Sequence, residues 1–527
     1  MSNDSLIPEI TGRRKAFGLI TIASVVLFLG LGVIVFEQDP HIPLLMGAMV
    51  GTGLAIIDGW KYNQIEKGMI NAISLAMQAI MILMVIGMLI GSWLAGGIIQ
   101  SMIYYGLDIV SPQFFFISAL IICSIISITT GTSWATAGTV GVVLIAIAGA
   151  LGINLGMAAG AIVSGAYFGD KLSPLSDTTN LAAGGAGVDV FTHIRSMLNT
   201  TIPNYILCMI IYVVLGFVFL QDAGGDISGI AALQSVLADS TNVTLLTLLA
   251  PAMVLLIVVL KIPALPGLLG AALVGVLMAV VLQGYTDFGD IIDILHYGYI
   301  FDGSALTNGE AASEFLFEQT LVDDGAIYAG MTYFDAAGEM TAAVSNLGHD
   351  PEAILEAEYL LSRGGLDSMM WTVSLIISAM IFGGVLEFSG MLASVVSMLE
   401  VFTRGPVSLV TTASLTAVIV NILSADQYIS IILPIRMFKP RFKELNISPR
   451  VHSRVGDSAG TMTSALVPWN TCGATMSAFL GVGAASFAFW AFFNWLSVVF
   501  EILAAMFKYK FFKRDEDIAA GIVDPTL

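Results

Sequence analysis

The residues best suited to chemistry in this 527-residue chain lie in a short polar stretch between two long apolar runs. Residues 167–180 read YFGDKLSPLSDTTN, so two carboxylates, one ammonium group and several hydroxyl groups fall together. Gly169 and Pro174 both disfavour a continuous helix, Gly through its backbone entropy and Pro through its missing N–H group. Inside a membrane, interrupted backbone persists only where it is buried in protein or lines a wet cavity. The stretch therefore predicts an ion-binding or substrate-binding site.

A similar interruption occurs in the second half of the chain. Residues 465–473 read ALVPWNTCG, and their proline follows the first one at an offset of 468 − 174 = 294 residues. At the same offset the polar segment 130–134 falls on residues 424–428, and Ser164 falls on Ser458. Two polar interruptions that keep one ungapped offset predict an internal duplication. Paired interrupted helices in two halves point to the binding site of a transporter.

Asp177 is the first candidate ligand of a transported cation. A carboxylate within a membrane segment is costly, so it usually faces the protein interior or a cavity. Its neighbours Ser176, Thr178 and Asn180 supply neutral oxygens, which are the ligands that a hard cation prefers. The alternative is that Asp177 caps a helix where the chain re-enters the membrane.

The second half offers a matching but unequal set of polar groups. Asp426 lies between two apolar runs and is the repeat-mate of Thr132, so the pair is one charged and one neutral oxygen ligand. Asp457 either binds the cation or caps a helix at the membrane surface, and Asn470 is the repeat-mate of Ser176. The predicted cation ligands are Asp177, Asp426, Thr132, Ser176, Thr178, Asn180, Asp457 and Asn470.

Three further residues are candidates for proton coupling. Asp170 and Lys171 are adjacent at the edge of the first interruption, where one of them caps or pairs, and Lys171 could neutralise a carboxylate when the cation is absent. Glu387 falls within an apolar run and either carries a proton or reaches the membrane surface. A carboxylate in such a site can bind a cation or a proton, so competition between the two would give antiport.

The composition sets the class of protein. Hydrophobic residues make up 57% of the chain and charged residues only 11%, whereas soluble domains have about 25% charged residues. Many apolar runs are near 20 residues long, which predicts an all-α polytopic membrane protein. The three cysteines lie in apolar runs without metal-like spacing, and no nucleotide-binding fingerprint stands out. We therefore expect no enzyme activity, no cofactor and no nucleic-acid partner.

The distribution of Lys and Arg orients the halves. The positive-inside rule places residues 13–15, 439–450 and the C-terminus in the cytoplasm. The span that Ile42-Pro43 opens then runs inward, whereas the similar Ile262-Pro263 opens an outward-running span. This predicts two inverted structural repeats, whose discontinuous (broken) transmembrane helices meet near mid-membrane.

The formal net charge of −19 is concentrated between residues 302 and 358, where only acidic residues are charged. This segment is either a solvated loop or an electrostatic attractor of cations. We expect the following parts: a cytoplasmic N-terminus (1–15), a first transmembrane repeat (16–222), a linker (223–242), the start of a second repeat (243–285), an acidic extracytoplasmic insertion (286–366), the rest of the second repeat (367–507) and a cytoplasmic C-terminus (508–527).

The stretch SGAYFGDKLSPLSDTTN at residues 164–180 resembles the signature of NhaC-type sodium/proton antiporters, and residues 424–427 and 467–471 are similar to the family's second-half pattern. The resemblance implies a secondary transporter that exchanges Na+, or Li+, for H+ across the cytoplasmic (inner cell) membrane. Its partners would be these ions and the lipid bilayer, and we expect a homodimer. The family also includes sodium-lactate/proton-malate exchangers, so a sodium-coupled organic-anion exchanger is the alternative. A channel is a third interpretation, which dependence on a pH gradient would distinguish.

Overall fold

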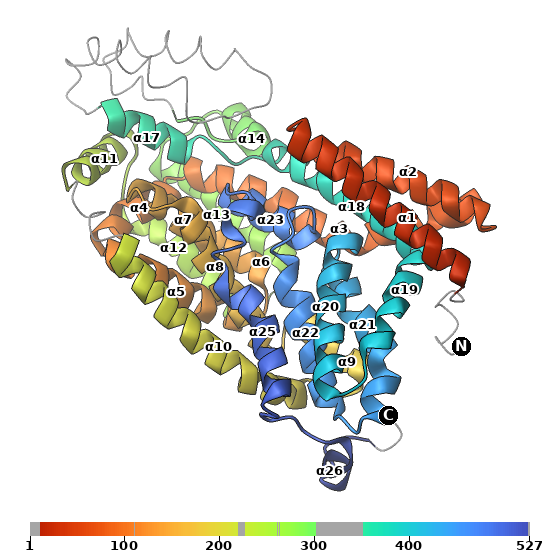
Figure 1. Ribbon diagram of the computed structural model, residues 1–527. Coiled ribbons are helices and arrows are strands. Elements are labelled where there is room, and N and C mark those ends of the chain that lie inside the picture. The colour runs from red at the N-terminus through yellow and green to blue at the C-terminus, as the bar shows by residue number, and fades with distance from the viewer. Residues whose placement is uncertain are drawn as a thin grey trace.

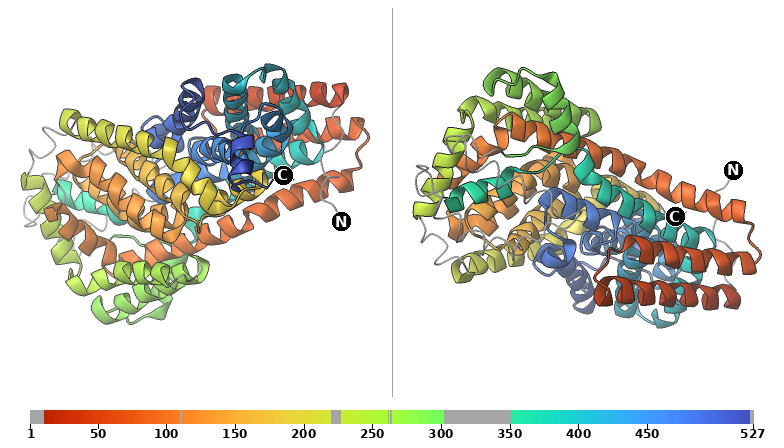
Figure 2. Two further views of the ribbon diagram at one scale, coloured as in Figure 1. Left: turned by 90° about the horizontal axis from the view of Figure 1, so that it is seen from below. Right: turned by 90° about the horizontal axis from the view of Figure 1, so that it is seen from above.

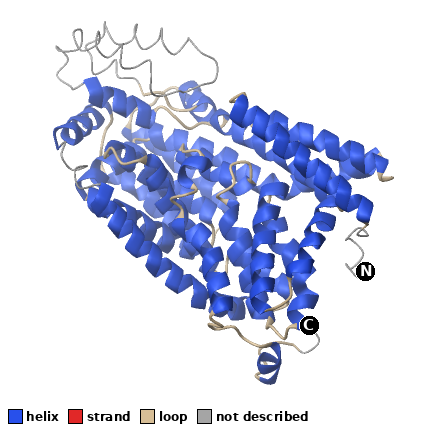
Figure 3. Ribbon diagram, in the orientation of Figure 1, coloured by secondary structure: helices blue, strands red, loops and turns tan. Residues whose placement is uncertain are grey.

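The computed structural model describes residues 11–109, 111–219, 227–260, 262, 264–301 and 351–524, and most of these residues are helical (Figure 3). Within these ranges, eight helices are long and apolar enough to cross a membrane. The number becomes nine if Ile230–Ser240 and Leu245–Val254, which are bent by 91°, form one span. The predicted polytopic α-helical membrane protein is confirmed.

The helices of the first half begin with an antiparallel pair and end with a long helix (Figure 1). The third helix starts at Tyr62, about ten residues before its long apolar run, because polar first turns extend the helix beyond its apolar part. The elements are α1 (Gly12–Leu29), the π-helical segment η2 (Gly30–Val35), α2 (His41–Ile57), α3 (Tyr62–Ala95), α4 (Ile98–Ile109), η3 (Pro112–Phe114), α5 (Phe115–Thr130), α6 (Ser133–Thr136), the π-helical segment η4 (Ala137–Gly141), α7 (Val142–Ala150), α8 (Leu155–Leu172), α9 (Asp177–Ala186) and α10 (Val190–Phe219).

The second half is also helical, and it ends with a short helix near the C-terminus. Residues 227–240 form a helix within the segment expected to be a linker, and residues 302–350 of the acidic insertion lie outside the described residues. The elements are α11 (Ile227–Ser240), η5 (Leu245–Leu248), α12 (Leu249–Val259), α13 (Ala264–Leu282), α14 (Phe288–Tyr297), α17 (Pro351–Leu361), η7 (Asp367–Met369), α18 (Met370–Phe388), α19 (Met391–Val396), η8 (Ser397–Phe402), α20 (Pro406–Ser424), α21 (Gln427–Glu444), α22 (Pro449–Ser464), α23 (Thr471–Leu480), α24 (Ala484–Phe487), α25 (Phe492–Met506) and α26 (Arg514–Ala519).

The boundaries of the central helices follow the 294-residue offset. Helices α9 and α23 start at residues 177 and 471 and are both 10 residues long, and 471 − 177 = 294. Helices α8 and α22 start at 155 and 449, and 449 − 155 = 294. The left-handed residues also match: Gly131 (φ 72°) with Ala425 (φ 57°), and Gly187 (φ 82°) with Gly481 (φ 67°). Corresponding segments therefore adopt corresponding backbone conformations.

Helices from the two halves interlock at the centre of the bundle. The α1–α2 pair packs against α18 and α19, whereas α13 packs against α3. Figure 2 shows the α1–α2 pair, in red, and the α12–α13 pair, in green, on opposite sides of the molecule. In the middle, α9 packs against α21 and α22, and α23 packs against η4 and α7. Each half thus inserts a short helix into the other half.

Helices α5 and α8 approach closely because glycines face the contact. A Cβ added at Gly165 would lie 2.4 Å from the backbone oxygen of Leu120, and one added at Gly169 would lie 2.5 Å from the backbone nitrogen of Ile128. Small residues allow membrane helices to pack backbone against backbone. This contact fixes the end of α8 where its polar residues begin.

We predict that Gly165→Ala destabilises the protein by about 1–3 kcal/mol, because the new methyl group must separate α5 from α8. Gly184→Ala is the matched control, since a Cβ at this helical glycine meets nothing within 4 Å. That change should stabilise by about 0.5–1 kcal/mol through its helix propensity. Thermal unfolding of the purified proteins measures both effects, and equal melting temperatures would contradict the close α5–α8 contact.

Candidate ion-binding site

A cavity of about 810 Å³ lies where the interrupted helices meet. Its wall includes residues of α3, α5, α6, α9, α13, α21 and α23, so both halves contribute. Among the described residues that line it, three are carboxylates and none is Lys, Arg or His. The other polar side chains of the wall are mostly hydroxyl groups and amides. The polar and charged lining residues are Gln78, Thr130, Thr132, Ser133, Thr139, Asp170, Ser176, Asp177, Thr178, Asp426, Gln427, Tyr428 and Thr471.

Asp177 is the first residue of α9, and its side chain is exposed to the cavity. The capping role belongs to its neighbour Ser176, whose Oγ accepts a hydrogen bond from the backbone nitrogen of Thr179 (3.4 Å). The Ser176 and Thr178 hydroxyl groups lie 3.0 Å apart. None of the hydrogen bonds within the described ranges engages the Asp177 carboxylate, so it remains available to a ligand.

Asp426 is buried, with 2% of its surface exposed, and also lines the cavity. It is the N-cap of α21: its Oδ1 accepts from the backbone nitrogen of Ile429 (2.9 Å). The preceding Ala425 is left-handed, and its carbonyl accepts from the backbone nitrogen of Thr471 (2.9 Å). This bond holds the start of α23 against the α20–α21 interruption. Asp426 therefore combines a capping role with a place in the cavity wall.

Asp170 is held at the start of α6. Its Oδ2 accepts from both the backbone nitrogen (3.2 Å) and the hydroxyl group (2.7 Å) of Ser133. Thr132, the N-cap residue of α6, is half-buried. Its side chain makes no capping hydrogen bond, so its hydroxyl group is not committed to the helix. The structure thus brings Thr132, Asp170, Ser176, Asp177, Thr178 and Asp426 to one cavity.

Asn180 and Asn470 do not appear in the cavity wall, and their amide groups hold the interrupted backbone instead. Asn180 donates to the carbonyls of Pro174 (2.9 Å) and Ser176 (2.8 Å). Asn470 donates to the Asn421 carbonyl (3.1 Å) and accepts from the Cys472 nitrogen (3.0 Å). Both predicted ligands therefore act as backbone anchors in this structure.

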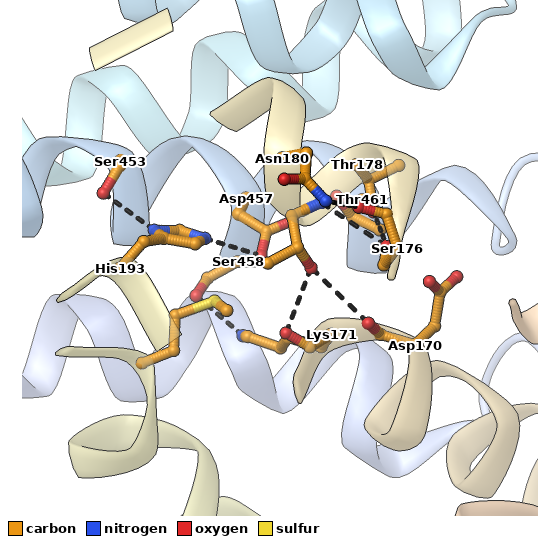
Figure 4. A network of polar contacts seen from close by, with 12 residues as sticks. Asp170, Lys171, Ser176, Thr178, Asn180, His193, Ser453, Asp457, Ser458 and Thr461 are labelled. Carbon is orange, nitrogen blue, oxygen red and sulfur yellow. Dashed lines mark hydrogen bonds and ion pairs between the residues drawn. The ribbon is translucent and has the colours of Figure 1, made fainter. Parts of the chain in front are cut away.

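Asp457 and Lys171 are fully buried outside the cavity wall (Figure 4). The Lys171 ammonium group donates to Ser458 Oγ (2.7 Å). Asp457 accepts a hydrogen bond from Thr461, and its Oδ2 lies 3.4 Å from His193 Nε2 of α10. The ammonium group and the carboxylate thus contact other protein groups rather than the cavity.

Two members of this buried region were not among the predicted site residues. Glu501 of α25 pairs with Arg454, at 2.9 Å between Oε2 and Nε, and both side chains are about 1% exposed. Glu501 is a lone carboxylate in the apolar helix 492–506, which is the signal that singled out Asp177. His193 carried no such signal.

Glu387 lies one residue before the end of α18, is exposed and does not line the cavity.

Comparisons of the sequence with known proteins identify the family of this chain. The sequence pattern of the Na+/H+ antiporter family matches residues 165–303 and 291–508. The Na(+)/H(+) antiporter NhaC of Alkalihalophilus pseudofirmus is 34% identical over 475 residues, which is 89% of this chain and 90% of that protein. The malate-2H(+)/Na(+)-lactate antiporter of Bacillus subtilis is 34% identical over 497 residues, 94% of each. The arginine/ornithine antiporter ArcD of Halobacterium salinarum is 31% identical over 514 residues, 96% of this chain and 95% of that protein.

These matches extend over nearly the whole chain and include both polar interruptions, so they confirm the resemblance carried by residues 164–180. The chain therefore belongs to the Na+/H+ antiporter family.

Proposed function

We propose that this protein exchanges Na+ for H+ across the cytoplasmic membrane, and that Li+ can take the place of Na+. The observation that carries the proposal is a cavity with three carboxylates, Asp170, Asp177 and Asp426, and no basic side chain among its described lining residues. Such a wall attracts cations and repels anions. Membership of the Na+/H+ antiporter family and the NhaC relative support the same activity.

The cation and the proton would compete for the same carboxylates. Asp177 and Asp426 supply negative charge, and the hydroxyl groups of Thr132, Ser176 and Thr178 supply neutral oxygens. A protonated carboxyl group is a poor ligand for Na+, so binding of one ion favours release of the other. Because none of the hydrogen bonds within the described ranges engages the Asp177 carboxylate, a cation or a proton can bind it without breaking the helix cap, which Ser176 forms.

The relatives are named for different substrates, so we choose between a cation and an organic anion for this protein from the side chains of its cavity. A malate or lactate carboxylate would face three aspartates without a basic partner in the described wall. Arg454 is paired with Glu501, and its guanidinium group does not line the cavity. The cavity therefore favours a cation over the organic anion that was the alternative.

The exchange would operate through two inverted repeats. We take the interruptions between α5 and α6, α8 and α9, α20 and α21, and α22 and α23 as breaks in transmembrane helices. The common 294-residue offset and the reciprocal packing of α9 and α23 support this interpretation. In Figure 1, α23 lies toward the upper side of the bundle and α9 toward the lower side, as inversion requires. Rocking of one repeat against the other would then expose the cavity alternately to each side.

We predict that Asp177→Asn abolishes Na+-dependent proton movement while the protein remains folded. The amide keeps the shape and one oxygen ligand but loses the charge and the exchangeable proton. Two unit charges about 4 Å apart near a protein surface attract each other by about 4 kcal/mol, and the variant loses this attraction for the cation. The measurement uses proteoliposomes with an internal pH dye, challenged with NaCl, LiCl and sodium malate. Exchange at the wild-type rate by Asp177→Asn would contradict the proposed site.

Asp189→Asn is the matched control for this experiment. Asp189 is exposed just before α10, outside the cavity wall. Hydrogen bonds from Thr192 and Phe191 lower the pKa of Asp189, so it is ionised at neutral pH and carries no exchangeable proton there. Asparagine can retain the capping bonds, because Asn and Asp are similar N-caps. The control should therefore exchange Na+ for H+ as the wild type does.

We predict that Asp426→Asn weakens Na+ binding more than Thr132→Ala does, because a charged ligand contributes more than a hydroxyl group. Asparagine can still cap α21 at the Ile429 nitrogen, so the backbone should be preserved. The Na+ concentration for half-maximal exchange should rise at least about tenfold, equivalent to about 1.4 kcal/mol. Na+-dependent thermal stabilisation of the same variants gives an independent measure of affinity. A larger effect of Thr132→Ala would show that Asp426 serves only as a cap.

A further inference from the structure

The last turn of α8 is tied to both halves of the protein. On one side the Asp170 carboxylate accepts from Ser133 at the start of α6. On the other side the Lys171 ammonium group donates to Ser458 of α22. The carbonyls of both residues also accept from the Thr179 hydroxyl group of α9, at 3.4 and 3.2 Å. A displacement of Asp170 at the cavity must therefore reach Lys171 through a single peptide unit.

From Lys171 the contacts continue to α25. Ser458 Oγ accepts from Lys171 (2.7 Å) and donates to Glu501 Oε1 (3.0 Å), and Glu501 Oε2 accepts from Arg454 Nε (2.9 Å). Thr200 of α10 also donates to Glu501 Oε1 (2.7 Å). Lys171, Arg454, Ser458 and Glu501 are each at most 1% exposed. We call these four residues the buried link.

The buried link and its neighbour Asp457 are balanced in charge. Lys171 and Arg454 supply two cationic groups, and Asp457 and Glu501 supply two carboxylates; Arg454 pairs with Glu501, whereas Asp457 lies 3.4 Å from His193 Nε2. Each is buried, and a buried charge that loses its counter-charge is strongly destabilising. The arrangement therefore requires no external cation, which separates it from the acidic cavity. Its polar contacts allow few alternative positions for the end of α8.

The buried link occurs only once in the duplicated frame of the described chain. At the 294-residue offset, Lys171 corresponds to Ala465, Arg454 to Gly160 and Glu501 to Leu207. Ser458 alone has an identical mate, Ser164. Ser164 Oγ lies 2.8 Å from the Tyr212 hydroxyl group and accepts from the Phe493 nitrogen (3.4 Å), so it contacts no charged side chain. The described chain therefore has this charged connection between α8 and the helices α22 and α25, and the positions at the 294-residue offset form no second one.

We propose that Lys171 and Ser458 are positioning residues that couple occupancy of the cavity to movement of α22 and α25. The proposal rests on the proposed function, because it assigns a step of the same exchange cycle. Neither side chain lines the cavity, so neither sets the affinity for Na+. Both sit between Asp170, which does line it, and the helices of the other half. They therefore set the rate at which the loaded protein changes conformation.

The test compares Ser458→Ala with Ser164→Ala, two buried serines at equivalent positions in the two halves. Ser458→Ala removes the hydroxyl group between Lys171 and Glu501 without changing any charge. We expect its kcat for Na+/H+ exchange to fall about tenfold, with the KM for Na+ and the Na+-dependent thermal stabilisation within about twofold of wild type. Ser164→Ala should keep both kcat and KM within about twofold of wild type.

Other outcomes overturn the proposal. If Ser458→Ala exchanges ions as wild type does, or loses affinity at unchanged kcat, the link does not govern the conformational step. If Ser164→Ala loses as much kcat, the effect is one of packing. Ser458→Cys is the second variant should Ser458→Ala fail to fold, since it retains every charge and nearly fills the site while its thiol is only a weak hydrogen-bond partner for Lys171 and Glu501, and a kcat equal to wild type would again refute the link. A wild-type protein without Na+/H+ exchange would instead refute the proposed function.

Discussion

The structure depends on one constraint: backbone groups freed by an interrupted helix inside an apolar bundle must find partners within the protein. Here the partners are side chains next to each interruption. Asn180 satisfies the carbonyls of Pro174 and Ser176, and Asn470 caps α23 while bonding to Asn421. Without these bonds the polar loops would leave backbone groups unsatisfied in the interior of the bundle, which is costly.

The same constraint explains where the carboxylates lie. Each of the three cavity carboxylates lies at the N-terminus of a helix: that of Asp170, which comes from the last turn of α8, accepts from the first residue of α6, Asp177 is the first residue of α9, and Asp426 caps α21. Freed N–H groups and the positive end of the helix dipole stabilise negative charge at these positions. The helix breaks therefore create the electrostatic conditions under which three carboxylates can surround one cavity. The fourth such helix, α23, is capped by neutral Asn470.

Helix starts and left-handed residues recur at the 294-residue offset, whereas the charged side chains differ between the corresponding positions. The backbone repeats closely enough that left-handed residues recur at the same offset, as at Gly131 and Ala425. The charged side chains do not repeat: at this offset Thr132 corresponds to Asp426, and Leu207 corresponds to Glu501. An exchanger with identical halves would have no charge difference between them. The cavity wall therefore receives two carboxylates from the first half, Asp170 and Asp177, and one from the second half, Asp426.

The sequence by itself determined the membrane class, the family, the 294-residue offset and the aspartates Asp170, Asp177 and Asp426, because charged residues are rare in apolar spans and the offset contains no gap. It also indicated where the helices would be interrupted, since Gly and Pro act locally on the backbone. Only the tertiary structure decided which polar groups are free. Asn180 and Asn470 turned out to hold backbone carbonyls and amides, and Asp457 to lie beside His193. The bond from Lys171 to Ser458 spans 287 residues, and such contacts depend on how helices of different halves pack, which no local pattern encodes.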